Sequence, residues 1–182
     1  NKSVIQPTLI HGDTQSQSTP VFALAHLLGI ELMPRIRNWK DLTLFRPTGD
    51  HEYKHIDSLF GEVIDWDLIQ THRKDMMQVV ISIQQNKISS AMILRKLGHY
   101  SRKNKLYRAF RELGRVIRTI FLLRYLSDPN LRKIITVTTN KVESFNGFSE
   151  LLRFGGFGVL QTNDPEEQEK RIKYNDLVAN AV

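Results

Sequence analysis

The sequence contains no cysteine and no long apolar stretch, and each absence excludes a class of protein. Without cysteine the chain can form neither a disulfide framework nor a thiolate metal site, which fits a reducing compartment. No apolar stretch approaches the roughly 20 residues of a membrane-spanning helix, and residues 1–20 lack the pattern of a signal peptide. Because the chain begins on Asn rather than Met, we expect a fragment of a longer protein, with no membrane partner.

The positive charge of the chain is concentrated in one segment. The net charge is +7 over 182 residues. Nine Lys and Arg side chains lie between Arg95 and Arg118, against a single acid, Glu112. A local excess of one sign indicates a polyanionic partner more strongly than a generally basic composition does. We therefore expect this segment to face a polyanion.

The opening of the chain has an α/β pattern. Residues 8–12 are typical of a short strand. Thr19 is the expected N-cap of the helix that follows, with Pro20 at its first position. Gly29 suits the end of that helix, and the next strand begins at Ile30. After Pro47 the pattern becomes mostly helical, with Asp65, Asn130 and Asp164 as expected N-caps. The expected later helices cover about residues 66–85, 89–98, 105–126, 131–154 and 165–182.

A carboxylate follows the first expected strand. Asp13 stands where the apolar residues stop, beside Gly12 and before a run of small polar residues. An acid at the end of a strand is one way in which proteins build a metal site. A strand that simply ends in a turn looks similar, because Asp is a common turn residue.

The long basic helix has two faces. Four arginines share one side, and their forked guanidinium groups suit phosphate oxygens. We expect this side to contact a phosphate backbone; the alternative is an ordinary solvated face, although such faces usually mix charges of both signs. The arginines are Arg108, Arg111, Arg115 and Arg118, and the opposite apolar side holds Leu106, Phe110, Leu113, Ile117, Ile120 and Phe121.

A second acid lies on the helix expected over residues 131–154. The positions three or four residues from Glu143 are small or polar, so a bulky ligand could approach its carboxylate closely. Taken alone, the segment fits an ordinary exposed helical Glu better than a functional one. On the other side we expect an apolar face that enters a core, formed by Ile135, Val142, Phe145, Phe148 and Leu152.

A competing motif occurs at residues 51–55, which spell HEYKH. In zinc peptidases the pattern H-E-x-x-H places two His one helical turn apart as zinc ligands, with the Glu as general base. Here His51, Glu52 and His55 follow a loop-like RPTGD segment, and no apolar face runs through them. The peptidase reading stays open as an alternative.

Five segments together resemble one protein family. In chain order they are HGDT, LMPRIRNWKDLTLFRP, HIDSLF, LRKLGHYSRKNKLYRAFRELGRVIRTIFLL and NKVESFN. They are similar to the C-terminal catalytic region of the Tn-three family of replicative transposases (the TnpA type), over nearly the whole chain. Members of that family carry a D-D-E triad on an RNase H-like fold with a helical insertion before the Glu.

The resemblance implies a fold and a division of the chain. It implies an α/β fold: a partial RNase H-like fold with a mostly helical insertion, whose first strands are absent. Residues 1–47 would form a strand–helix–strand unit with Asp13, residues 48–128 a helical insertion with the basic face, and residues 129–182 the Glu143-bearing helix and a last helix. Residues 1–12 contain no acid, so the first Asp of the triad has no counterpart in this chain.

The resemblance also implies a chemistry. Asp13 matches the second Asp of the triad and Glu143 its Glu, within an N-K-x-E-x-x-N pattern. Both would be catalytic metal ligands for two Mg²⁺ or Mn²⁺ ions, a site left incomplete here. The full-length protein would be a bacterial cytoplasmic DNA transposase, acting as a homodimer on transposon ends and target DNA, and this chain alone would be inactive. The alternative is a DNA-binding remnant without catalysis. The expected DNA-binding residues are Arg35, Arg37, Arg102, Lys103, Lys105, Arg108, Arg111, Arg115, Arg118, Asn140, Lys141 and Asn146.

Overall fold

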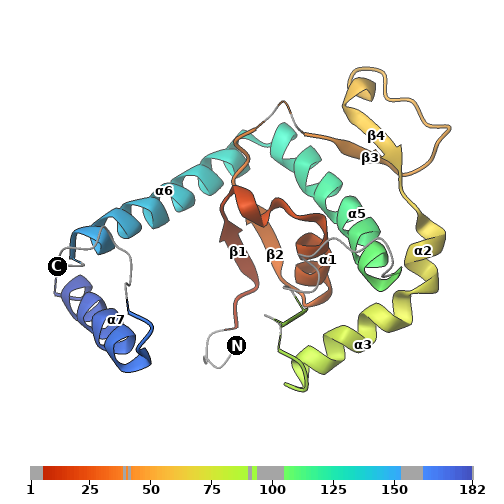
Figure 1. The fold of residues 1–182 in the computed structure, drawn as a ribbon. Helices are drawn as coiled ribbons and strands as arrows, with labels where there is room; N and C mark the ends of the chain where they lie inside the picture. The colour runs from red at the N-terminus through yellow and green to blue at the C-terminus, as the bar shows by residue number, and fades with distance from the viewer. Residues whose placement is uncertain are drawn as a thin grey trace. The chain divides into compact units, whose positions relative to one another are not determined.

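The computed structural model describes residues 6–38, 40, 42–89, 92–93, 105–152 and 162–181. It shows a mixed α/β fold that is mostly helical, with small parallel sheets (Figure 1). The chain splits into two compact units, Asn1–Ile135 and Thr136–Val182, which are described separately below. Among the described residues, no helix combines the length and the apolar character that crossing a membrane requires.

The first sheet joins the two strands expected from the sequence. Strand β1 (Leu9–Gly12) pairs in parallel with β2 (Glu31–Pro34), with Gly12 opposite Pro34. Helix α1 (Thr19–Leu27) connects them, after a 3-10 turn at Thr14–Gln17. Its N-cap is Ser18, not the expected Thr19, which is already the first helical residue. The predicted helix end is confirmed at Gly29, whose φ of 74° lies in the left-handed region that glycine adopts without strain.

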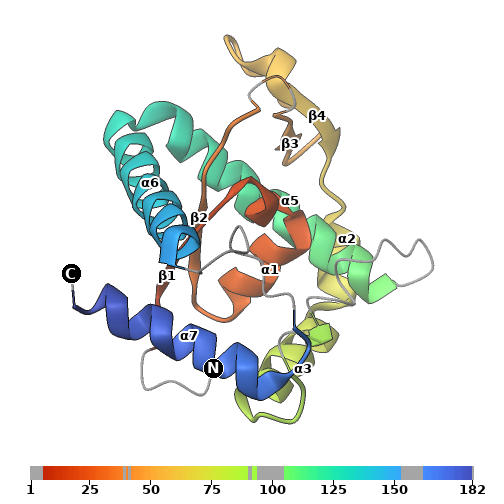
Figure 2. The same cartoon turned by 60° about the vertical axis from the view of Figure 1, so that its left-hand side comes forward.

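Helix α5 (Lys105–Ser127) packs along α1, and the two views agree on this arrangement (Figures 1 and 2). The Phe22 and Phe121 rings meet with their centroids 5.6 Å apart and contribute to the core of the first unit. Gly114 lies directly against the carbonyl of Thr19, where a Cβ atom would overlap the backbone. The two helices can approach this closely because residue 114 has no side chain.

A second parallel pair was not predicted from the sequence. Strand β3 (Leu44–Arg46) pairs with β4 (Phe60–Val63), which follows a 3-10 turn at Asp57–Leu59. The backbone N–H of Phe45 donates to the Thr119 hydroxyl of α5 at 3.1 Å. Both strands are too short for alternation to show in the sequence, and half of β4 is polar or glycine.

Two predicted helices differ from the structure in detail. Asp65 caps as expected, accepting from the Leu68 N–H at 2.9 Å. The helix after it is divided at His72 into α2 (Trp66–Thr71) and α3 (Arg73–Gln84), because His72 leaves helical geometry at φ −100° and ψ 11°. The helix expected at residues 89–98 lies mostly outside the described residues.

The next helix, α6 (Pro129–Leu152), has a different cap from the predicted one. Asp128, not Asn130, supplies the capping oxygen, accepting from the N–H groups of Asn130 at 2.8 Å and Leu131 at 3.2 Å. The cap moved because Pro129 begins the helix, and its fixed φ and missing N–H suit the first helical position.

In the second unit, the described residues belong mostly to α6 and α7 (Pro165–Ala179). Asp164 caps α7 through the Glu166 N–H at 3.0 Å, as predicted. The expectation of a continuous buried face on α6 is wrong. Ile135, the last residue of the first unit, is fully buried, but Val142 is 54% and Phe145 49% exposed.

Candidate functional site

Asp13 lies at the carboxyl end of the first parallel sheet. It follows the last residue of β1 directly, and it is exposed. The Ser16 hydroxyl donates to its Oδ1 at 3.4 Å, and the Ser16 N–H donates to its carbonyl at 3.1 Å. Parallel strands present their carboxyl ends at one edge, where ligands of open α/β sheets usually bind.

Gly12 explains why no bulky neighbour covers this acid. A Cβ atom at residue 12 would overlap the Ser16 side chain. The absence of a side chain at Gly12 lets the 3-10 turn at Thr14–Gln17 fold back against the strand end. The turn thus leaves the Asp13 carboxylate on the surface, although Asp13 also takes part in a further interaction.

Two predicted DNA-binding arginines lie at the same edge of the sheet. The Arg35 N–H donates to the Gly12 carbonyl at 2.9 Å, so Arg35 follows β2 beside the residue that precedes Asp13. The Gln17 side chain donates to the Arg35 carbonyl at 3.2 Å. Arg35 is half-buried and Arg37 exposed, and both already have interactions of their own. The structure therefore brings Asp13 and Arg35 together at one strand edge.

Glu143 lies on α6 in the second unit and is exposed, as are Asn140, Lys141 and Asn146. Nothing lies within 4 Å of a Cβ built at Gly147, one turn further along. The Glu143 face thus has the low relief expected from the sequence. Since Asp13 and Glu143 belong to different units, their approach to each other stays a prediction.

The donor set fits a hard divalent cation in its chemistry and is incomplete in number. Carboxylate oxygens are the ligands that Mg²⁺ and Mn²⁺ prefer. In the ranges that the structure describes, no group of three or more His, Cys, Asp or Glu side chains could hold a metal ion. Asp13 and Glu143 could supply two ligands of such a site.

The arginine face of α5 contains a buried acid that sequence reasoning did not weigh correctly. The Glu112 side chain is only 4% exposed, and it pairs with Arg115 at 3.0 Å and with Arg111 at 3.4 Å. Arg115 also reaches Glu62 of β4 at 2.6 Å and lies over the Phe45 ring at 4.5 Å. The available signal was the i, i+3 spacing of Glu112 and Arg115. Arg115 is therefore engaged within the first unit.

The other predicted cations of this segment differ in their surroundings. Lys105 and Arg108 are exposed, whereas Arg118 is half-buried. Burial lowers the pKa of the Arg118 guanidinium, and its Nε is closed off from solvent with no hydrogen-bond acceptor. Arg102 and Lys103 lie outside the described residues.

The HEYKH segment does not have the geometry of a zinc peptidase. Residues 51–56 form a loop and turn, not the helix that would place His51 and His55 on one side. Tyr53 instead stacks on Phe60, with centroids 4.2 Å apart. The Tyr53 N–H donates to Asp57 at 3.1 Å. The segment is tied to the core by its tyrosine.

Asp57 anchors the same loop to β3. Its two carboxylate oxygens each accept from Arg46 at 2.7 Å. The bidentate hydrogen bonds from Arg46, with the backbone hydrogen bond from Tyr53, lower the pKa of Asp57 to about 2. Arg46 and Asp57 belong to two of the segments that carried the family resemblance, LFRP and HIDSLF, so part of that resemblance is structural.

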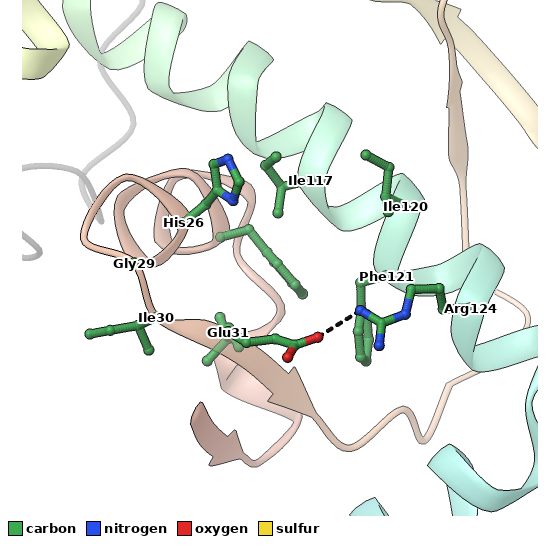
Figure 3. A pocket seen from close by; sticks show the side chains of 10 residues that line it. His26, Gly29, Ile30, Glu31, Ile117, Ile120, Phe121 and Arg124 are labelled. Atoms are coloured by element: carbon green, nitrogen blue, oxygen red, sulfur yellow. Dashed lines mark hydrogen bonds and ion pairs between the residues drawn. The ribbon is translucent and has the colours of Figure 1, made fainter. Parts of the chain in front are cut away.

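The first unit also has a pocket of about 420 Å³ between α1, β2 and α5 (Figure 3). Figure 3 shows Glu31 and Arg124 facing each other there, and their ion pair measures 2.6 Å. Most of the remaining lining is apolar, including Ile117, Ile120 and Phe121. None of the predicted site residues lines this pocket, and its only charged groups in the lining satisfy each other, so we assign it no ligand.

Comparison with known proteins decides the family. The sequence model described as "Tn3 transposase DDE domain" matches residues 1–182. The chain belongs to this family. It is 35% identical over 170 residues to the transposase of transposon Tn1546 from Enterococcus faecium, which covers 93% of this chain and 17% of that protein.

Other transposases match over the same portion. The transposase of transposon Tn21 from Escherichia coli is 35% identical over 93% of the chain and 17% of its own length. The transposase of transposon gamma-delta from Escherichia coli K12 is 28% identical over 98% of the chain and 18% of its length. The chain thus spans less than a fifth of each of these relatives. The predicted membership of the Tn3 family is confirmed, and a DDE domain implies the use of a divalent metal in general.

Proposed function

We propose that this chain is part of the catalytic domain of a replicative DDE transposase, in which Asp13 and Glu143 are ligands of a Mg²⁺ or Mn²⁺ site. The match of the whole chain to the Tn3 transposase DDE domain carries the proposal. The exposed position of Asp13 at the carboxyl end of β1 supports it. An RNase H-like sheet would supply the third ligand from a strand beside β1.

The proposed reaction is DNA cleavage followed by strand transfer. In the full-length protein, acting as a homodimer, water would cleave a phosphodiester at each transposon end and release a 3′-OH. That 3′ oxygen would then form a bond to a phosphorus atom of target DNA, while the target's own 3′ oxygen leaves. Divalent ions at such a site activate the attacking oxygen and stabilise the leaving one. Asp13 and Glu143 would hold them, and the cations near Asp13 and on α5 would hold the DNA phosphates.

The first experiment measures whether the two carboxylates share a site. Because the chain has no cysteine, Ser18→Cys and Gly147→Cys allow spin labels to be placed near Asp13 and Glu143 alone. We expect a label separation that puts the two carboxylates within roughly a nanometre of each other. A separation that forbids this approach would overturn the shared metal site.

Mn²⁺ binding gives a second readout. We expect weak binding that Asp13→Asn and Glu143→Gln each reduce, with the double variant no worse than the single ones because one site is lost in each case. The matched control is Glu150→Gln, another exposed acid on α6. If the control reduces Mn²⁺ binding as much, the carboxylates act only through general charge.

A nicking assay separates catalysis from DNA binding. With too few metal ligands, the 182-residue chain should bind DNA but leave transposon-end duplexes uncut in Mg²⁺. Robust Mg²⁺-dependent nicking that Glu143→Gln abolishes would contradict the expected inactivity of this chain. A full-length protein with Asp13 and Glu143 intact that never cleaves would favour the alternative of a DNA-binding remnant.

A further inference from the structure

The four arginines on the polar side of α5 do not have equal surroundings. Arg111 and Arg115 face the buried Glu112 carboxylate at 3.4 and 3.0 Å, and Arg115 also pairs with Glu62. Their charge is balanced inside the first unit. Removing these two from the solvent-facing group leaves Arg108, which is exposed, and Arg118, which is half-buried.

Arg118 lacks the ion pairs that Arg111 and Arg115 make with Glu112. Within the described residues Arg118 makes no hydrogen bond and no ion pair. Its Nε is buried without an acceptor, as is the Nε of Arg111. Leaving a buried donor of a charged group unmatched is costly, because the protein does not replace the water it displaces. The charge of the Arg118 guanidinium therefore has no anionic partner within the described residues.

We infer that Arg118 is the arginine of α5 that is built to receive a phosphate oxygen of the DNA backbone, whereas Arg111 and Arg115 hold the fold together. The inference rests on the proposed function. A planar guanidinium donates to phosphate from several nitrogens at once. The terminal nitrogens of Arg118 are not among its buried atoms and have no acceptor within the described residues, so a phosphate oxygen can accept from them. Arg108 is exposed, so it attracts the DNA backbone through its charge alone and its guanidinium is not held in one position.

The competing explanation is that the aliphatic stem of Arg118 covers apolar surface while its charged end stays in water. The two explanations differ in what Arg118→Met does. Methionine keeps an apolar stem and removes the charge, so it preserves a covering role and abolishes phosphate binding.

The test is a salt titration of binding to a fluorescent 20-base-pair duplex, with thermal unfolding of each variant. Each phosphate contact contributes about −0.9 to the slope of log K against log salt on duplex DNA. Arg118→Gln and Arg118→Met should each reduce the slope by about one contact without lowering the Tm, since no partner is lost. Arg118→Lys should keep the slope and bind a few-fold more weakly, because the fork is lost.

The matched control is Arg124→Gln, on the same helix but paired with Glu31; it should leave the slope unchanged. A wild-type slope in Arg118→Met would overturn the inference and support a covering role. Arg118→Gln that fails to fold would also overturn it, because Arg118 would then have a structural role.

Three further outcomes separate the possible failures. If wild type shows no salt-dependent duplex binding, both the inference and DNA binding by this segment fail together. If wild type binds steeply and Arg118 variants match it, only the inference fails. If inorganic phosphate raises the Tm of wild type but not of Arg118→Gln, while the DNA slopes are equal, the position binds a free anion and the assignment to DNA is wrong.

Discussion

Helices α5 and α6 are nearly equal in length, 23 and 24 residues, and both have an amphipathic sequence, but they are used differently. In α5 the apolar side is covered by α1, and on the other side Thr119 contacts β3 and Arg115 contacts β4. In α6 the apolar side chains beyond Ile135 are largely exposed. Amphipathic spacing shows that a helix face requires a partner, but the partner itself is set by tertiary structure.

The largest difference between the two helices should appear on removing an aromatic side chain. Phe110 on α5 is 1% exposed and Phe145 on α6 is 49% exposed. Phe110→Ala should lower the free energy of unfolding by about 3–5 kcal/mol, since it leaves a cavity. Phe145→Ala should cost less than about 1 kcal/mol. Denaturant titration of both variants measures the difference, and equal losses would mean that the α6 face is packed in solution.

The two glycines within these helices should respond to alanine in opposite directions. Gly114→Ala would push a methyl group into the Thr19 carbonyl and separate α5 from α1. We expect a loss of about 3 kcal/mol, since backbone cannot move aside as a side chain can. Gly147→Ala meets nothing within 4 Å and should gain about 0.5–1 kcal/mol in unfolding free energy, because alanine favours a helix. A stabilised Gly114→Ala variant would show that the close approach is absent.

Removing one cation from each helix should also separate them. Arg115→Gln leaves the buried Glu112 with two weaker contacts, from Arg111 and from the Asp65 N–H, both at 3.4 Å. We therefore expect a loss of about 2 kcal/mol in unfolding free energy. Lys141→Gln on α6 removes an exposed charge and should change stability by less than about 0.5 kcal/mol. Thermal unfolding of the two variants checks this. If Arg115→Gln left the stability unchanged, Arg115 would again be a candidate for binding phosphate.

The smallest expected effect concerns acid stability in the two units. Hydrogen bonds from Arg46 lower the pKa of Asp57 from its ordinary value of 3.8 to about 2. The unfolded chain then binds this proton more readily than the folded chain. The stabilisation is complete above the ordinary value and disappears as the pH falls towards 2. Asp57→Asn should therefore flatten the fall in stability of the first unit between about pH 5 and pH 2.

The second unit supplies the matched acid. A hydrogen bond from Lys173 lowers the pKa of Glu169 on α7, in an ion pair that is exposed on both sides. Like the Arg46–Asp57 pair, this ion pair stabilises the folded state above the ordinary pKa of its acid, but solvent weakens it. Glu169→Gln should leave the pH profile of unfolding nearly unchanged. If Glu169→Gln changed the pH profile of unfolding more than Asp57→Asn, the acid-sensitive ion pair would be Lys173–Glu169 and not Arg46–Asp57.

Local signals allowed much of the fold to be predicted. Gly29 ended α1 as expected, and Asp65 and Asp164 capped their helices, because a cap depends on the nearest few residues. The β3–β4 pair was missed, since strands of three and four residues contain too little alternation to identify. Asp128 took the capping position from Asn130 because Pro129 fixed where the helix begins.

The candidate site could be predicted only in part. The exposed position of Asp13 after a strand and of Glu143 on a helix followed from the sequence. The unequal surroundings of the α5 arginines did not, because Glu62 of β4 and Phe45 of β3 reach Arg115 from separate segments. A helical wheel assigns all four arginines to one face, but only the tertiary contacts show which of them are buried or paired.

The hydrogen bond between Phe45 and Thr119 has a consequence for self-association. Strand β3 has three residues, and its Phe45 N–H is occupied by a hydroxyl on α5 at 3.1 Å. Another chain cannot extend the sheet through a donor that is already in use, and unpaired strand edges are common starting points for aggregation. Thr119→Val would keep the shape of the side chain and leave that donor without its acceptor. Thr119 of α5 therefore prevents intermolecular strand pairing at Phe45, because a helix and not the strand itself supplies the acceptor.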